Sequence, residues 1–213
     1  MERPKINKRK ITNDWQKYCP ELSKLRMLDI DNRVGSLVIG FYLQIIGDGT
    51  IYMPLYKVGN LYSHYSVLPS SLEIEGRSMD MQMHEIYSEQ IAQQLIQKAY
   101  IPLQGEVTFE DVKNGYERYF KNPNKGTIVE YEDYVYISSW TRKKELFDNA
   151  LHTVYNELKS WPEERYFVRD GGFKNWMLEL EKKASNHEVL EANYRMKFEK
   201  YKIEKLPERP FCF

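Results

Sequence analysis

The stretch LVIGFYLQII at residues 37–46 is almost continuously apolar, and it is followed by GDGT at 47–50 and by IYMPLY at 51–56. Gly and Asp tolerate the positive φ angles of tight turns, so two β-favouring runs divided by Gly-Asp-Gly predict a β-hairpin. Pro54 has no N–H to donate to a strand ladder, which places the second strand at a sheet edge or the proline at a bulge.

The segments on either side of the hairpin extend this pattern. On the N-terminal side, the leucines of the 20–28 segment recur at helical spacing and predict a short helix. On the C-terminal side, β-favouring residues predict strands at 62–68 and 71–75. The first part of the chain is therefore expected to be rich in strands.

The apolar period changes to a helical one after residue 80. Apolar residues on one face predict a helix over 85–100, and Thr108 with Asp111 forms a capping pair at the start of a second helix. Two short β-favouring runs, 127–131 and 134–138, then predict a second hairpin.

The C-terminal third is predicted to be mainly helical. Apolar faces recur within 147–161, 173–180 and 189–201, and the segment 166–168 is expected to be a last strand or a packed loop. No internal repeat or linker is recognisable. The sequence predicts an α+β fold in which an antiparallel sheet, made of the N-terminal hairpin and further strands, packs against several helices. It forms a single domain over 13–213, preceded by a flexible basic arm at 1–12.

Composition narrows the class of protein. The chain of 213 residues has 31 Lys and Arg against 31 Asp and Glu, so it lacks the overall positive field of a general nucleic-acid binder. Its N-terminus shows no secretory signal, and no apolar run approaches the roughly 20 residues that cross a bilayer. Cys19 and Cys212 lie near opposite ends, which indicates no disulfide framework. We expect a cytoplasmic protein that does not enter membranes.

The motifs of common enzymes are missing. The chain has no Gly-x-x-x-x-Gly-Lys-Ser/Thr, no Gly-x-Gly-x-x-Gly after a strand, no Gly-x-Ser-x-Gly and no His-Glu-x-x-His. This favours a non-catalytic role without a cofactor, although it does not exclude an enzyme of another type.

Tyrosine is the unusual residue of this sequence, with 17 copies. It combines a large apolar body with a hydrogen-bonding tip and is enriched at protein interfaces. Two groups of tyrosines are candidate partner-binding residues, and side chains that fill the margin of the core are the alternative. The candidates are Tyr52, Tyr56, Tyr62 and Tyr65 in the first group and Tyr131, Tyr134 and Tyr136 in the second.

An alternative hypothesis is a metal-dependent enzyme of unfamiliar type. Asp80, His84 and Glu85 combine carboxylates with an imidazole, which suits a divalent metal or acid–base chemistry. Interleaved methionines are equally typical of an amphipathic edge whose polar side is in water. Asp29 and Asp31 form an Asp-x-Asp pair that ligates metals in some transferases but is common by chance.

The leading functional hypothesis is non-catalytic protein–protein interaction, as in an accessory, inhibitor or immunity-type protein of a bacterium or phage. The expected partner is another protein, and a homodimer is the alternative. A third hypothesis is nucleic-acid binding through the basic arm, which the neutral overall charge disfavours. That arm contains Arg3, Lys5, Lys8, Arg9 and Lys10.

Overall fold

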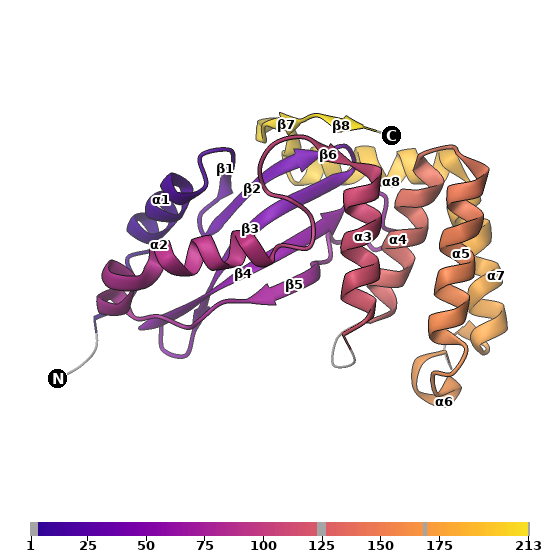
Figure 1. Ribbon diagram of the computed structural model, residues 1–213, viewed down its shortest axis with the longest axis horizontal. Helices are drawn as coiled ribbons and strands as arrows, with labels where there is room; N and C mark the ends of the chain where they lie inside the picture. Colours follow the sequence, from indigo (N-terminus) through magenta and orange to yellow (C-terminus); the bar gives the residue numbers. More distant parts are fainter. Residues whose placement is uncertain (1–3, 123–126, 168–169, 213) are drawn as a thin grey trace.

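A computed structural model describes residues 4–122, 127–167 and 170–212. An antiparallel sheet with strand order β1-β2-β3-β4-β5 forms its centre, and the short strand β7 (Glu208–Arg209) pairs in parallel with β2 (Figure 1). The sheet strands are β1 (Ser23–Arg26), β2 (Asp29–Val34), β3 (Leu37–Ile46), β4 (Ile51–Asn60) and β5 (Ser71–Glu75). A separate parallel pair joins β6 (Val107–Thr108) to β8 (Phe211–Cys212).

The hairpin predicted from Gly-Asp-Gly is confirmed. Strands β3 and β4 pair from Ile46 and Ile51 onward, and Gly47 and Gly49 both adopt positive φ angles at the turn. The edge position expected for β4 is wrong, because β4 lies between β3 and β5. Pro54 lies next to Gly76, just past the end of β5. Its carbonyl oxygen accepts a hydrogen bond from the Gly76 N–H at 2.8 Å, so its missing N–H removes only the return bond.

Three expectations for the strand-rich part are wrong. Helix α1 (Lys8–Tyr18) takes in the last five residues of the proposed arm 1–12, because the Asn7 side chain accepts a hydrogen bond from the Lys10 N–H and begins the helix there. In the 20–28 segment, Ser23–Arg26 form β1 instead of a helix; Leu25 lies in this strand, and Leu22 and Leu28 are buried on either side of it. The expected strand at 62–68 is a series of turns and bends.

The helices predicted after residue 80 are present. Thr108 and Asp111 form the capping box at the start of α3, as predicted. The 166–168 segment, expected to be a last strand or a packed loop, begins with the last residue of short helix α6 (Glu163–Tyr166), and Val168 lies outside the described residues. The other helices are α2 (Met81–Lys98), α3 (Phe109–Phe120), α5 (Lys144–Leu158), α7 (Phe173–Ser185), α8 (His187–Lys200) and the 3-10 turn η2 (Ile203–Lys205).

The second hairpin is wrong, because residues 127–138 belong to helix α4 (Ile128–Trp140). Thr127 and Glu130 form a capping box that begins this helix. Almost all of its residues are buried, so the helix has no polar face and its Tyr, Val and Ile content resembles that of a strand. Packing on several sides, rather than local propensity, determines its structure.

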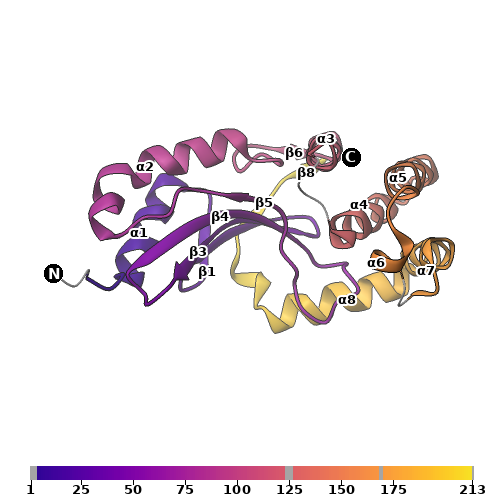
Figure 2. The ribbon, with the colours of Figure 1, turned by 90° about the horizontal axis from the view of Figure 1, so that it is seen from below.

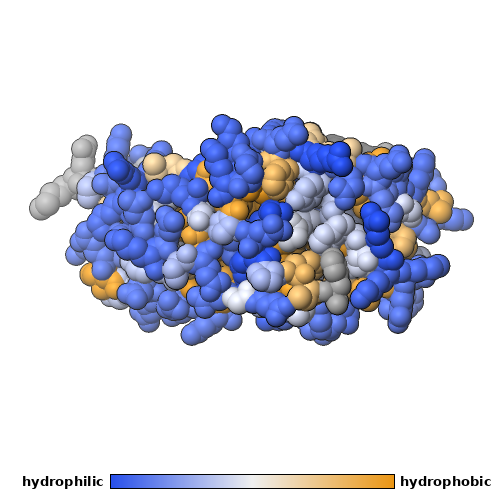
Figure 3. Space-filling view, turned by 90° about the horizontal axis from the view of Figure 1, so that it is seen from above, coloured by the Kyte–Doolittle hydropathy of each residue, from blue (hydrophilic) through white to orange (hydrophobic). Residues whose placement is uncertain are grey.

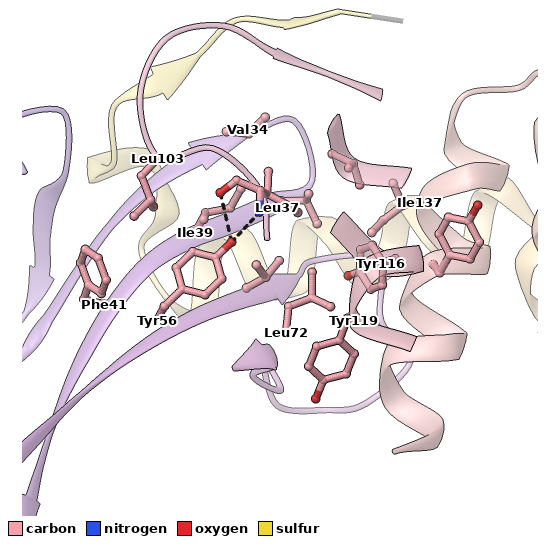
Figure 4. Packing of buried hydrophobic residues seen from close by; sticks show 14 of the residues in the cluster. Val34, Leu37, Ile39, Phe41, Tyr56, Leu72, Leu103, Tyr116, Tyr119 and Ile137 are labelled. Atoms are coloured by element: carbon pink, nitrogen blue, oxygen red, sulfur yellow. Dashed lines mark hydrogen bonds between the residues drawn. The ribbon is translucent and has the colours of Figure 1, made fainter. Parts of the chain in front are cut away.

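Helices cover the two faces of the sheet differently. Figure 2 shows α1 and α2 on one face and α8 on the other, with α4, α5 and α7 beside the end of the sheet. Trp15 of α1 packs edge-on against Phe41 at 5.2 Å between ring centroids. Tyr56 points into the same core, where its hydroxyl exchanges hydrogen bonds with the backbone of Ile101 (Figure 4). One cluster of buried apolar side chains runs from this face into the C-terminal helices.

Across residues 4–122, 127–167 and 170–212, no helix has the length and apolar character needed to cross a membrane.

Candidate functional site

The sheet face toward α8 carries a row of polar side chains. Residues directly opposite each other in an antiparallel sheet share a face. Asp31 of β2 pairs with Gly40 of β3, and Gly40 pairs with Lys57 of β4. Asp29, two residues before Asp31, lies on the same face because side chains alternate along a strand. The Lys57 ammonium therefore reaches across Gly40 toward both carboxylates.

Ion pairs hold these side chains together as the Lys57 cluster, defined as Asp29, Asp31 and Lys57. The Lys57 Nζ lies 2.8 Å from Asp29 Oδ1 and 3.0 Å from Asp31 Oδ1. Arg26 Nε donates to Asp29 Oδ2 at 2.8 Å. The side chains of Asp29 and Asp31 are 2% and 0% exposed and that of Lys57 is 13% exposed, so all three charges are largely removed from water. Such burial is costly and is a reason to ask what these groups do.

A cavity of about 500 Å³ opens above this cluster and is called the sheet-face cavity below. Its size is in the range of pockets that hold small molecules. Asp29 and Lys57 line its base, whereas Asp31 lies behind them and does not line it. Its other charged lining residues are Arg26, Lys200 and Lys202, and its apolar and aromatic lining residues are Leu25, Tyr42, Leu68, Pro69 and Tyr201.

Burial and ion pairing act differently on the three titrating groups. Burial raises the pKa of Asp31 to about 7, against the attraction of Lys57 and with the repulsion of Asp29. The pKa of Asp29 is lowered because the positive charges of Lys57 and Arg26 outweigh the effect of burial. The pKa of Lys57 is raised because the two carboxylates outweigh the effect of burial on the ammonium. At neutral pH Lys57 is therefore a charged donor and not a nucleophile.

Gly40 makes the Lys57 cluster possible. A Cβ at this position would lie 2.0 Å from the Ile30 carbonyl oxygen and 2.7 Å from Asp31 Oδ1. We expect Gly40→Ala to lower the free energy of unfolding by about 2 kcal/mol or more, since overpacking a sheet row forces backbone shifts. Urea denaturation measures this, with Gln44→Ala on the exposed part of the same strand as the control. Equal stability of both variants would contradict the packing argument.

The candidate partner-binding tyrosines do not form a surface. Tyr65 is the one that is partly exposed, and the other six are at most 3% exposed within the core. Their alternation in the sequence resembled a strand with one exposed side, but helix α4 and the inner strands bury both sides. The buried tyrosines are Tyr52, Tyr56, Tyr62, Tyr131, Tyr134 and Tyr136.

The exposed apolar residues do not replace that tyrosine surface. On the face seen in Figure 3 they form separate patches within a largely hydrophilic surface. Single exposed apolar side chains are normal in monomeric proteins. The protein-partner hypothesis stays a prediction, but six of its seven proposed contact residues are buried.

Two further cavities adjoin the buried tyrosines. One, of about 320 Å³, brings together His64, Tyr65 and the buried Glu132, whose Oε1 accepts a hydrogen bond from Trp176 Nε1 at 3.2 Å. The other, of about 580 Å³, is a wide and open depression that includes Tyr62. Neither gathers as many charged side chains around a buried cluster as the sheet-face cavity does.

The proposed metal ligands do not converge. Asp80 caps the N-terminus of α2 by accepting a hydrogen bond from the Met83 N–H, and the Glu85 side chain is 63% exposed beside Lys10. His84 is buried and contacts the Tyr52 hydroxyl through Nδ1 at 2.6 Å. Within the described part of the chain, no three His, Cys, Asp or Glu side chains are placed to hold a metal ion. Asp29 and Asp31 instead hold the Lys57 ammonium.

His84 is best explained as part of the packing between α1 and α2. Its Nε2 lies 3.2 Å from Asp14 Oδ2, and burial lowers its pKa. We expect His84→Ala to lower the free energy of unfolding by about 2 kcal/mol, because Tyr52 and Asp14 lose a partner. Glu85→Ala should change it by less than about 0.5 kcal/mol. Chemical denaturation of both variants tests this, and a large effect of Glu85→Ala would restore a role for the predicted site.

The basic arm is partly occupied by internal contacts. Arg3 lies outside the described residues, whereas Lys8 and Arg9 are exposed on the first turn of α1. Lys10 forms an ion pair with Asp14 at 2.9 Å. Nucleic-acid binding through this region stays a prediction.

Comparison with protein-family models, with curated proteins and with solved structures finds no match for this chain. Its site is therefore interpreted from its own residues.

Proposed function

We propose that the protein binds a small organic oxyanion in the sheet-face cavity. The ligand carries a carboxylate, phosphate or sulfonate head joined to a short apolar body. The observation that supports this most directly is the position of the Lys57 ammonium, which lies at the base of the cavity between Asp29 and Asp31.

The donors at the base of the cavity have remaining capacity. An ammonium carries three N–H donors. The Lys57 ammonium lies at ion-pair distance from both carboxylates and can still donate to a ligand in the cavity that it lines. Arg26 uses its Nε on Asp29, which leaves the fork of its guanidinium for a second acceptor. An oxyanion at the base of the cavity can therefore accept charge-assisted hydrogen bonds from both side chains.

The charge and shape of the walls fit the same ligand class. Lys200 and Lys202 add positive charge at the rim. Leu25 and Leu68, with the ring of Tyr42, provide the apolar and aromatic surface that small-molecule pockets use to hold a ligand body. A strongly polar anion without such a body would leave these walls unused.

The test compares three probes of similar shape: phenyl phosphate, benzoate and neutral benzyl alcohol. Isothermal titration calorimetry should show that the two anions bind and that the alcohol binds at least about tenfold more weakly, since it lacks charge-assisted contacts. Binding of the alcohol as tightly as the anions would contradict the proposal.

A matched variant removes the charge and keeps the volume. In Asp29→Asn/Asp31→Asn/Lys57→Met, the whole Lys57 cluster becomes neutral, so no unpaired charge is left in the interior. We expect this variant to fold and to lose oxyanion binding. Lys113→Met, a change at a partly exposed residue outside the cavity, is the control and should bind as the wild type does. Unchanged affinity of the triple variant would show that the anions bind elsewhere.

A further inference from the structure

The two carboxylates of the Lys57 cluster occupy different positions relative to the sheet-face cavity. Asp29 lines its base, whereas Asp31 is fully buried and contacts the ammonium from the far side. A ligand in the cavity and the Asp31 carboxylate therefore share one ammonium without touching each other. The charge of the ligand is therefore felt at Asp31 through their shared neighbour Lys57.

The charge balance of the occupied site points to a proton. Lys57 and Arg26 supply two positive charges at the base, and Asp29 and an ionised Asp31 already supply two negative ones. A bound oxyanion adds a third negative charge beside the Lys57 ammonium, whose side chain is 13% exposed, and there it repels the fully buried Asp31 carboxylate. Lys200 and Lys202 lie at the exposed rim, where water screens them.

From this arrangement, and resting on the oxyanion-binding function proposed above, we propose that the protein takes up a proton on the Asp31 carboxyl when the oxyanion binds. Solvent or buffer supplies the proton, which adds to one carboxylate oxygen of Asp31 and leaves Lys57, Arg26 and Asp29 charged. Ligand binding in the sheet-face cavity is thus coupled to pH.

The direction of the pH effect follows from the positions of these groups. Asp31 titrates near neutral pH in the empty protein because burial raises its pKa. The oxyanion draws on the same ammonium and repels the carboxylate, so the pKa of Asp31 rises further in the complex. Between these two values binding takes up a proton, and the affinity falls as the pH rises.

The expected size of the pH effect follows if binding raises the pKa of Asp31 by about one unit. The affinity then falls about fivefold between pH 6 and pH 8, and about 0.4 proton is taken up per ligand at pH 7. Well below neutral pH, Asp31 is protonated before the ligand arrives, and no proton should be exchanged.

Benzenesulfonate is the suitable probe because its charge does not change over this pH range. Calorimetric titration at pH 7 in Bis-Tris and in imidazole, two amines with different enthalpies of ionisation, measures the number of protons taken up. Phosphate and sulfonate buffers are avoided because they would compete for the site. A heat that differs between the two buffers at pH 7, with a difference that nearly vanishes at pH 6, is the expected result.

The variant Asp31→Asn tests whether Asp31 is the residue that takes up the proton, because asparagine resembles the protonated acid but does not titrate. This variant should bind benzenesulfonate with an affinity that is constant between pH 6 and pH 8 and with the same heat in both buffers. If Asp31→Asn does not fold, the buffer and pH dependence of the wild type decide alone.

The possible failures are distinct. Binding of benzenesulfonate with equal heats in both buffers at pH 7 would overturn the proton uptake and leave the proposed function standing. Proton uptake that persists in Asp31→Asn would assign the proton to another residue and also overturn this inference. Absence of any binding between pH 5 and pH 8 would overturn the proposed function itself.

Discussion

Replacing Lys57 alone by methionine is expected to lower the free energy of unfolding by about 3 to 5 kcal/mol. The substitution removes the positive charge between Asp29 and Asp31 but leaves both carboxylates buried. Breaking a buried ion pair on one side is far more costly than removing it completely. The loss should be smaller at pH 5 than at pH 8, because protonation of Asp31 relieves part of the repulsion.

The triple variant Asp29→Asn/Asp31→Asn/Lys57→Met is the control for this prediction. It carries the same methionine but no carboxylate, and a buried amide without a partner costs less than a buried charge, so its free energy of unfolding should lie above that of the single variant. Guanidinium denaturation at both pH values measures the difference from the single variant. If the single and triple variants were equally unstable, the lost packing of the lysine stem, and not charge, would be the cause.

Stability alone does not explain why the Lys57 cluster is present. Apolar side chains of similar volume would usually stabilise a sheet face at least as well as a buried ion pair does. The Lys57 cluster is accompanied by Gly40, which leaves room for the carboxylate of Asp31, and by a cavity that reaches Lys57. A cluster serving stability alone would need neither a donor facing a cavity nor that cavity.

The local signals that predicted the fold correctly are those with a direct backbone cause. Gly47 and Gly49 fix the turn of the β3–β4 hairpin through their positive φ angles, and Thr108 with Asp111 fixes the start of α3 by reciprocal capping. Both depend on residues that are close in sequence. They therefore needed no knowledge of the tertiary structure.

Helix α4 could not be predicted from its apolar pattern. Because nearly every side chain of this helix is buried, the pattern has no 3.6-residue period to detect. The usable signal was Thr127 followed by Glu130, a capping box that the β-favouring tyrosines outweighed. The same all-round burial explains why the tyrosines of α4 are core residues and not a docking surface.

The Lys57 cluster could be predicted only in part, because its residues lie on different strands. The spacing of Asp29 and Asp31 placed both carboxylates on one face of a strand, but their partner Lys57 lies two strands away. Pairing across β3 brings the ammonium to them, and sequence spacing carries no information about that register. The metal interpretation of Asp-x-Asp identified the correct negative pair and the wrong cation.

The stability of the protein should be highest on the acid side of neutrality, and Glu132 provides the clearest test. Burial raises its pKa from 4.5 to about 7, with Tyr65 and Trp176 opposing the rise. A carboxyl whose pKa is raised in the folded state contributes fully below pH 4.5, and its contribution is lost as the pH rises through about 7. For Glu132 this loss is on the order of 3 kcal/mol. Burial raises the pKa of Asp133 and Asp31 too, and both act in the same direction.

A lowered pKa has the opposite effect at more acid pH. Ion pairing and hydrogen bonding with Lys10 and His84 overcome burial and lower the pKa of Asp14 to about 2. The stability that this carboxylate provides is lost below about pH 4. Burial lowers the pKa of His64 to about 4 and also lowers that of His84, so the stability that both histidines provide is lost as the pH falls below about 6.5, which opposes the gain from the buried carboxyls there. The free energy of unfolding should therefore decline most clearly between about pH 6.5 and pH 8.

Glu132→Gln isolates the contribution of one residue to this decline. Glutamine still accepts the hydrogen bond from Trp176 Nε1 but cannot lose a proton. Urea denaturation between pH 4.5 and pH 8 should show that the variant loses less stability than the wild type over this range. Glu179→Gln, an exposed change at the same cavity, should leave the pH profile unchanged. Parallel profiles for wild type and Glu132→Gln would mean that the Glu132 carboxyl is already ionised in the folded protein at acid pH, held by a counter-charge at that cavity.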